Sequence, residues 1–377
     1  MSTFIDIHVI QSVPPSNVNR DDTGSPKSAM YGGVRRSRVS SQAWKRAARK
    51  SYQRDIDASG LGYRTKQVAE LIGQRMAKLD ASMDDTTRAQ RAGAVLKALG
   101  MKLEPKRRKK GGDEEPESPF ESSAYLAFFS ADQLDKFAKL AIETEKPTRR
   151  QARECADSDH GLTVSLFGRM VADDTSLNVD AAVQVAHALS THAVDTEADY
   201  YTAVDDVLEG DKDREDSGAG MIGTIEFNSS TLYRYATINV DQLIENLGAR
   251  EAAARACAAF VEGFVTSMPT GKQNTFANST LPEAVVVVVR DDLPINLVGA
   301  FETPVTSRGG FLRPSCEAFA RYSAEVTDAY DAPAVRTLVL RVSDDAAALD
   351  ALGERVGLRA LIGAVSDAVD DEPSDAS

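Results

Sequence analysis

Residues 222–240 read IGTIEFNSSTLYRYATINV, and this stretch carries the prediction of the fold. Aromatic and β-branched residues stand on both sides of Asn228-Ser229-Ser230, a run of turn-forming residue types. The pattern predicts two strands joined by a hairpin turn at these three residues. The other elements of the predicted fold lie on either side of it along the chain.

The flanking elements follow a regular order. Residues 4–10 (FIDIHVI) are β-rich, and Ser40 or Ser41 can cap a helix that runs to about Tyr52. After the hairpin come a long amphipathic helix, with its apolar stripe around Phe260, and a buried strand at 284–290. The order β-α-ββ-α-β is typical of the ferredoxin-like fold, an antiparallel sheet backed by two helices. RNA binding, as in the RRM, is one of its common uses.

A mostly helical segment separates the two halves of this pattern, and we predict an α+β protein. The expected helices lie near residues 64–79, 84–99, 131–146 and 179–193. Further expectations are a polar loop around Gly24, Gly32 and Gly33, a mobile charged loop at 106–117, a strand at 337–342 and a disordered acidic tail at 367–377.

Composition narrows the class of protein. The 377 residues exceed one average domain, and the net charge is −13. No stretch approaches the roughly 20 apolar residues of a membrane span. The three cysteines are far apart in the sequence and predict buried thiols. We therefore expect a cytoplasmic protein without a membrane anchor.

Positive charge is concentrated in one segment of this acidic chain. Residues 20–54 contain ten basic and two acidic residues, a local net charge of +8. At about 100° per residue, the predicted helix carries Gln42, Lys45, Arg46 and Arg49 on one side and Trp44 on the other. Backbone amides at the start of the helix would add donors for anions. Basic residues spread over a loop and one helical face favour a phosphodiester backbone as the ligand.

Motifs for other chemistry are weak. Residues 218–223 (GAGMIG) match the dinucleotide fingerprint in letters, but an acidic run precedes them and a strand pattern follows. No histidine or cysteine spacing predicts a metal site or a catalytic triad. Asp21 and Asp22 could hold a cation in a nuclease, although pairing with Arg20 or its neighbours is the simpler interpretation. We expect no cofactor, no metal and no catalytic residue.

Several collinear stretches resemble the CasC-type backbone subunits of the type I-E CRISPR surveillance complex, Cascade. They are FIDIHVIQSVPPSNVNRDD (4–22), YGGVRRSRVSSQAWKRAARKS (31–51), FGRM (167–170), AHALSTHAVDTEADYYTAVDD (186–206), GTIEFNSSTLYRYATIN (223–239) and GGFLRPS (309–315). The resemblance implies a non-catalytic antiviral protein whose copies assemble head-to-tail along one CRISPR RNA, beside other Cascade subunits. Each copy displaces one guide base, and the bases between pair with target DNA.

The resemblance also implies a hand-like organisation. Residues 1–54 and 222–345 would form a ferredoxin-like (RRM-like) palm, 55–190 the helical fingers and 191–221 the thumb; 346–377 would form a C-terminal segment with the acidic tail. Charge and resemblance together give a set of RNA-binding residues: Arg20, Lys27, Arg35, Arg36, Arg38, Ser40, Gln42, Lys45, Arg46, Arg49, Arg169, Met170, Tyr201, Lys272 and Gln273. Of these, Met170 and Tyr201 would flank the displaced base.

Two alternatives remain at this stage. One is an RNA-cleaving member of the same superfamily, which either processes the guide or cuts target RNA with Asp21 or Asp22. A processing enzyme would need a general base near a glycine-rich loop, and Gly309-Gly310 has no histidine close to it in the sequence. The other alternative is a homo-oligomeric scaffold that forms filaments without RNA.

Overall fold

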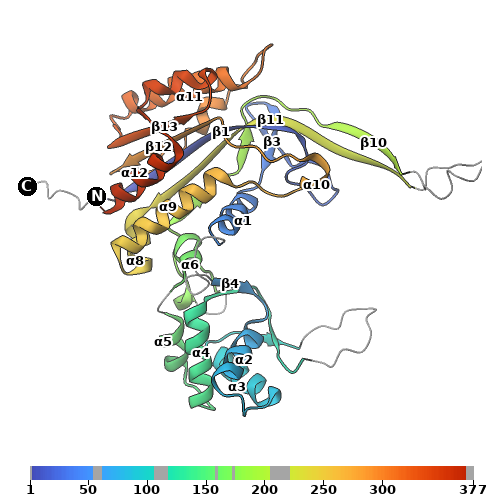
Figure 1. Cartoon of the computed structure of the whole chain (residues 1–377), viewed down its shortest axis with the longest axis vertical. Helices are drawn as coiled ribbons and strands as arrows, with labels where there is room; N and C mark the ends of the chain where they lie inside the picture. The colour runs from blue at the N-terminus through green and yellow to red at the C-terminus, as the bar shows by residue number, and fades with distance from the viewer. Residues whose placement is uncertain are drawn as a thin grey trace, which may run out of the picture. The chain divides into compact units, whose positions relative to one another are not determined.

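The computed structural model describes residues 2–53, 62–105, 118–157, 160–171, 175–203 and 221–370. The chain divides into two compact units. Unit 1 comprises Met1–Ser51, Val185–Thr237 and Ala258–Ala368, and unit 2 comprises Tyr52–Gln184, Ile238–Cys257 and Val369–Ser377. The class is α+β, with one large sheet, as predicted (Figure 1). Within the described ranges, no helix is both long and apolar enough to span a membrane.

The large sheet has the strand order β14-β13-β12-β1-β11-β9-β3-β2, and β8 and β10 pair with β11 outside this row. Its strands are β1 (Phe4–Ser16), β2 (Ser28–Tyr31), β3 (Val34–Val39), β8 (Val183–Val185), β9 (Ala188–Ser190), β10 (Glu197–Ala203), β11 (Met221–Asn239), β12 (Ala284–Arg290), β13 (Arg336–Arg341) and β14 (Glu354–Arg355). The accompanying helices are α1 (Ser41–Tyr52), α9 (Arg250–Thr266), α10 (Gln273–Phe276), η3 (Leu297–Phe301), α11 (Leu312–Ala329), η4 (Asp344–Ala351) and α12 (Leu358–Asp370).

The centre of the sheet is buried on both faces. Strand β1 pairs antiparallel with β12, from Phe4 opposite Arg290 to Ile10 opposite Ala284. All residues of β12 are buried, and alternation along a strand sends neighbouring side chains to opposite faces. Val286 and Val288 belong to the core that contains Phe319 of α11. Figure 1 shows α11 on one side of the sheet and α1 with α9 on the other.

The predicted hairpin at residues 228–230 is wrong, because β11 continues through it as one strand of 19 residues. Asn228, one of the residues that suggested a turn, has a partner on β3 instead: the Ser37 hydroxyl donates to Asn228 Oδ1 at 3.2 Å. Strand β11 pairs antiparallel with β9, with Ser190 opposite Leu232, and with β10, and it also pairs with β1 and β8. Among the elements of the large sheet and its helices, β1, α1, β9, β11, α9 and β12 follow one another in this order along the chain, with other elements between them.

Two further expectations about this part of the chain are corrected. The helix predicted near residues 179–193 is replaced by β8 (Val183–Val185) and β9, because pairing with β11 outweighs the helix propensity of an alanine-rich stretch. The polar loop contains the β2–β3 hairpin, which turns through Gly32 and Gly33 with φ of +57° and +76°. A Cβ on Gly32 would lie 1.6 Å from the Glu302 carbonyl oxygen, so the turn excludes any side chain there.

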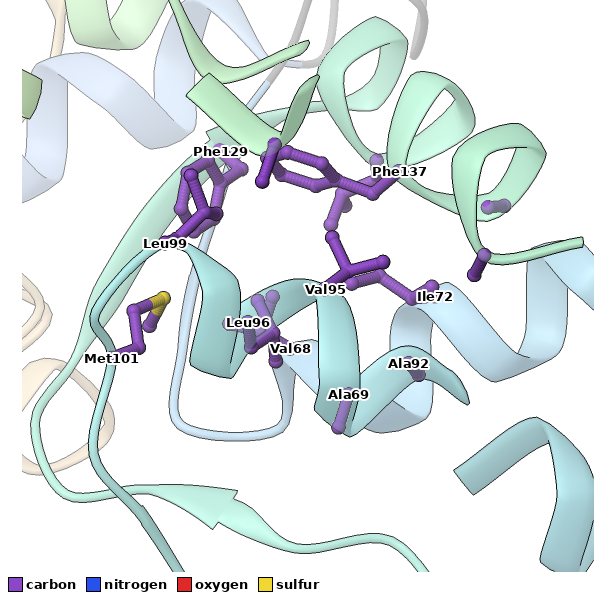
Figure 2. Close-up of a cluster of buried hydrophobic side chains, with 14 of the residues drawn as sticks. Val68, Ala69, Ile72, Ala92, Val95, Leu96, Leu99, Met101, Phe129 and Phe137 are labelled. Atoms are coloured by element: carbon purple, nitrogen blue, oxygen red, sulfur yellow. The ribbon is translucent and has the colours of Figure 1, made fainter. Parts of the chain in front are cut away.

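Unit 2 has its own apolar core, shown in Figure 2. Helices predicted near 64–79, 84–99 and 131–146 are confirmed as α2 (Val68–Leu79), α3 (Asp85–Ala98) and α4 (Ala131–Glu143). The rings of Phe129 and Phe137 meet edge to face, 5.1 Å apart. The other elements of this unit are β4 (Gly62–Thr65), β5 (Leu103–Glu104), β6 (Ser122–Ser123), β7 (Ala127–Ser130), α5 (Arg149–Ala156), α6 (Leu162–Phe167), η2 (Thr175–Leu177) and α8 (Val240–Leu247).

Some predictions concern residues outside the described ranges. They are Arg54, the charged loop at 106–117, the larger part of the predicted thumb at 204–220, including the first three residues of the GAGMIG motif, and the end of the acidic tail at 371–377. The prediction of disorder is wrong for the first residues of that tail, because 367–370 belong to α12.

Candidate nucleic-acid interface

The basic residues of the first 50 positions lie on three neighbouring elements of unit 1: the loop after β1, the β2–β3 hairpin and α1. Their exposure differs. Arg20, Arg35, Gln42 and Arg46 are exposed, Lys27, Arg38, Lys45 and Arg49 are half-buried, and Arg36 and Ser40 are buried. The structure therefore brings most of the predicted phosphate contacts to one region, and it assigns Arg36 a different place.

Asn19 connects the loop after β1 to the start of α1 through hydrogen bonds. Its carbonyl oxygen accepts the Lys27 amide at 2.9 Å, and its side-chain oxygen accepts the Ser40 amide at 2.9 Å. The Arg38 amide in turn donates to the Lys27 carbonyl oxygen at 2.9 Å. These bonds fix the backbone of the loop, of β3 and of the start of α1 relative to one another. The cationic side chains thus project from a rigid frame.

The packed side of α1 is anchored by an aromatic and cationic stack. Trp44 is 1% exposed and meets Phe264 edge to face, 6.4 Å between centroids. The Arg234 guanidinium lies 3.7 Å from the Trp44 ring centroid, donates to Gln11 Oε1 at 2.6 Å and also donates to the Phe264 carbonyl oxygen. The predicted division of α1 into a packed and a polar side is confirmed at Trp44. On the polar side Lys45 is half-buried, and burial lowers its pKa.

Arg36 is a structural residue, which corrects its prediction as an RNA contact. Its side chain is fully buried. The guanidinium donates to the carbonyl oxygens of Tyr31 at 3.1 Å, Ser190 at 3.0 Å, Phe301 at 2.8 Å and Glu302 at 3.3 Å. A group that already satisfies four backbone acceptors inside the fold presents no surface to a phosphate.

The amides at the start of α1 are also occupied, contrary to the expectation that they bind an anion. The Ser40 amide donates to Asn19, and the Gln42 amide donates to Ser40 Oγ at 3.3 Å, so Ser40 caps the helix. The Ser41 amide donates to Nδ1 of His187 at 2.9 Å. His187 is exposed, and partial burial together with the charges of Arg38 and Lys27 lowers its pKa. Composition alone gave no signal for this histidine.

Strands β10 and β11 form a two-stranded extension of the sheet, here called the arm (Figure 1). Tyr201 stands opposite Gly223, and its ring occupies the space of the missing side chain, because a Cβ there would lie 2.5 Å from the phenol. Tyr201 is 37% exposed and Tyr200, on the opposite face, is 64% exposed. One aromatic face of the arm is therefore supported by the backbone of β11, and the other is open.

The base of the arm adjoins the basic residues within unit 1. The Asn17 side chain donates to the carbonyl oxygens of Glu226 and Gly24, both at 2.9 Å. Phe227 packs on Phe276 of α10, 5.9 Å between ring centroids. Helix α10 begins after Lys272, which is half-buried and has a left-handed φ of 48°.

Gly271, which precedes Lys272, fixes the position of the turn before α10 relative to the chain that follows β1. A Cβ on Gly271 would lie 2.0 Å from the Val18 carbonyl oxygen, so the turn lies directly against the chain that leads into the basic segment. Gln273 is exposed, and its amide donates to Ser279 Oγ at 3.0 Å. Lys272 and Gln273 thus belong to the same region as Lys27.

The two predicted contacts in unit 2 differ from each other. Met170 is 81% exposed. Arg169 is 5% exposed, and it donates to the carbonyl oxygens of Leu177 at 2.8 Å and Ala156 at 3.2 Å. Burial lowers the pKa of Arg169 to about 10. Its prediction as an RNA contact is therefore corrected: it stabilises the fold that carries Met170.

The acidic pair after β1 is engaged in a turn. Asp21 Oδ1 accepts the Thr23 hydroxyl at 2.7 Å, the Thr23 amide at 2.9 Å and the Ser25 amide at 3.0 Å. These bonds, led by the Thr23 hydroxyl, lower the pKa of Asp21. In the described ranges Asp21 and Asp22 form no ion pair with an arginine, so the expected pairing is replaced by turn formation.

A histidine does lie next to Gly309-Gly310, which the sequence separation concealed. His192 stacks on Phe311 at 3.6 Å between ring centroids, and both line a hollow of about 430 Å³ with the two glycines. His192 Nε2 accepts the Thr231 amide at 3.1 Å, and Nδ1 donates to the Ala193 carbonyl oxygen at 2.9 Å. Both ring nitrogens serve the backbone, and burial lowers the pKa of the ring. In this arrangement His192 stabilises the surrounding backbone and does not offer a nitrogen to act as a general base.

The described part of the chain contains no group of three or more histidine, cysteine or acidic side chains placed to hold a metal ion. Cys257 and Cys316 are buried as predicted, whereas Cys155 is half-buried.

Comparisons with known proteins agree with this architecture. The family of CT1975-like proteins matches residues 5–364. A chain of a solved CRISPR RNA-guided surveillance complex, described as pre-nicking, is 34% identical with a TM-score of 0.82, and the match covers 97% of this chain and 100% of that one. A chain of a second solved CRISPR RNA-guided surveillance complex is 30% identical with a TM-score of 0.72, covering 96% and 99%. No curated protein matches the sequence.

Proposed function

This chain belongs to the CT1975-like protein family, and we propose that it is a backbone subunit of a Cascade-type surveillance complex that holds CRISPR RNA. The similar solved chains come from RNA-guided surveillance complexes. The observation that carries the proposal is the rigid basic region of unit 1, where Lys27, Arg38 and the polar side of α1 are fixed by Asn19 in an otherwise acidic protein. Such a region binds a phosphate backbone without reading bases.

In more detail, the proposed mechanism is that of the CasC-type backbone subunits. Unit 1 would be a ferredoxin-like palm, which the strand order β12-β1-β11-β9 and the helices α1 and α9 support. The helices of unit 2 would be the fingers, and the arm the thumb. Copies would assemble head-to-tail along the guide in the cytoplasm, beside other Cascade subunits. Tyr201 and Met170 would flank a displaced base, and the bases between would pair with target DNA, as in other RNA-guided systems.

A double substitution tests the phosphate contacts. Lys45→Ala with Arg49→Ala removes two cationic side chains from the polar side of α1. For single strands the slope of log affinity against log salt flattens by roughly 0.7 per lost contact, so we expect a change of about 1.4 per subunit. The measurement is a salt titration of guide binding by the purified chain, with guides of equal length and unrelated sequence expected to agree within a few-fold.

The matched control is Arg321→Ala with Arg359→Ala, which removes the same charge from exposed positions on α11 and α12. Its salt slope should equal that of the parent. An unchanged slope in the α1 variant, or an equal change in both variants, would place the guide elsewhere. Light scattering with and without guide completes the test, because filaments without RNA would favour a plain scaffold.

A second experiment addresses base displacement. In an assembled complex, bases held out of the stack react with chemical probes at regular intervals along the guide. Tyr201→Ala with Met170→Ala should even out this periodic reactivity and weaken target binding. Retention of the parent pattern would show that these two side chains do not flank the displaced base.

We also propose that the chain is not an enzyme. The carboxylate of Asp21 is committed to its turn, and His192 has both nitrogens bonded to backbone groups. Incubation with guide and target RNA plus magnesium should leave both RNAs intact. Cleavage that disappears in Asp21→Ala or Asp22→Ala would favour the RNA-cleaving alternative instead.

A further inference from the structure

Three titratable side chains from separate segments meet at the start of α1: Lys27 in the loop, Arg38 on β3 and His187 just before β9. His187 holds the Ser41 amide through Nδ1 at 2.9 Å. Lys27 and Arg38 are close enough to act electrostatically on the imidazole, and both disfavour its cationic form. The structure thus places the imidazole of His187 near two cationic side chains.

The proton on this ring has one possible position. A backbone amide can only donate, so Nδ1 of His187 must be the acceptor, and the neutral ring carries its proton on Nε2. Among the described residues, Nε2 has no hydrogen-bond partner, and the side chain is exposed. The ring therefore accepts a bond from the helix on one side and offers a donor to solvent on the other.

The hydrogen bond from the start of α1 to Nδ1 of His187 polarises the imidazole ring. The first amides of a helix carry its positive end, and chains of hydrogen bonds polarise one another. The bond from Ser41 therefore strengthens Nε2–H as a donor beside two cationic side chains. A phosphate oxygen suits such a donor, since charge-assisted bonds are about twice as strong as neutral ones.

We propose that His187 is a further guide-binding residue, whose Nε2–H donates to a backbone phosphate of the RNA while Nδ1 keeps α1 capped. The inference rests on the proposed function, because it adds a contact to the same phosphate-binding region. It also replaces the direct amide–phosphate contact expected from the sequence, which the bonds of Ser40 and Ser41 preclude.

Two near-isosteric substitutions separate contact from capping. His187→Gln places an amide donor near the position of Nε2 and lacks the acceptor at Nδ1, whereas His187→Asn retains an acceptor near Nδ1 and lacks the outer donor. The affinity of the full-length chain for a short single-stranded RNA that one copy covers is measured together with the thermal midpoint of the free protein. Lys45→Ala with Arg49→Ala serves as the reference.

We expect each variant to change one of the two measured quantities and leave the other nearly unchanged. His187→Asn keeps the thermal midpoint and binds RNA about tenfold more weakly, while His187→Gln lowers the midpoint and binds within about threefold of the parent. Equal affinity of parent and His187→Asn, or affinities that simply follow the midpoints, would overturn the contact and leave His187 as a cap. If the reference variant also binds like the parent, the proposed function fails as well, so the two failures are distinguishable.

Discussion

The basic region and the arm are neighbours in unit 1, yet they are held in different ways. In the basic region, the buried side chains of Asn17 and Arg36 and the half-buried side chain of Asn19 bind backbone groups of distant segments. The arm consists of a ladder between β10 and β11, in which Tyr200 is largely open to solvent and Tyr201 lies over Gly223.

The difference fits the ligand that we propose for each region. Phosphates recur at a fixed spacing, so a charged surface that holds several of them needs positions set by a rigid frame. A ring that stacks on a base needs only the right direction, because every base offers a similar flat face. The basic region therefore depends on internal bonds, and the arm depends on the stiffness of paired strands.

The largest expected effect comes from breaking the frame of the basic region. Arg36→Ala leaves four carbonyl oxygens without their donor and opens a cavity, and we expect unfolding to require about 3 kcal/mol less free energy. Denaturant unfolding measures this. The adjacent Arg35→Ala is the control: Arg35 is exposed, so its stability should change by less than about 0.5 kcal/mol. Similar losses in both variants would contradict the division between frame and surface.

An intermediate effect distinguishes the binding chemistry of the two regions. Tyr201→Ala should weaken guide binding by about 1–3 kcal/mol, the usual worth of one stacked ring, with the salt slope unchanged because no charge is lost. The measurement is guide affinity at several salt concentrations. Tyr200→Ala, on the opposite face of the arm, is the matched control and should have the smaller effect. A larger loss from Tyr200→Ala would assign the stacking to the open face.

The smallest effect concerns the turn at Asp21. Because hydrogen bonds lower the pKa of its carboxylate in the folded state, ionised Asp21 stabilises the fold above the ordinary pKa of 3.8, and this contribution disappears as the pH falls through the folded value. Asp21→Asn should therefore be slightly less stable than the parent near pH 7, and the difference should shrink towards pH 3. Thermal unfolding across that range checks it. A difference independent of pH would show that the charge of Asp21 plays no part.

Elements with local signals could be predicted from the sequence. Helix α1 and strand β12 follow from periodicity and from an apolar run, and both are confirmed. The predictions are wrong where the structure of a segment depends on a partner that is distant in the sequence. Asn228 looks like a turn residue, but Ser37 satisfies its side chain within a continuous strand. Residues 188–190 favour a helix in isolation and form a strand beside β11.

The same reasoning applies to the candidate site. The +8 segment indicated where the candidate interface lies, because its charge is visible in the sequence. Arg35 and Arg36 are indistinguishable there, because the burial of Arg36 depends on carbonyl groups near residue 301. His187 was missed for a similar reason: its role depends on an amide 146 positions away.

Because β11 runs without a break from the sheet into the arm, the number of residues at the junction decides which way the side chains of the arm point. Side chains alternate along a strand, so one residue added between Gly223 and Tyr233 would turn every side chain of the arm strand to the opposite face. Gly223 would leave its place opposite Tyr201, and a residue with a side chain would take that place, so the Tyr201 ring would lose the space that it occupies. Two added residues would restore the faces and lengthen the strand by about 7 Å. Length changes that preserve function at this junction should therefore come in even numbers.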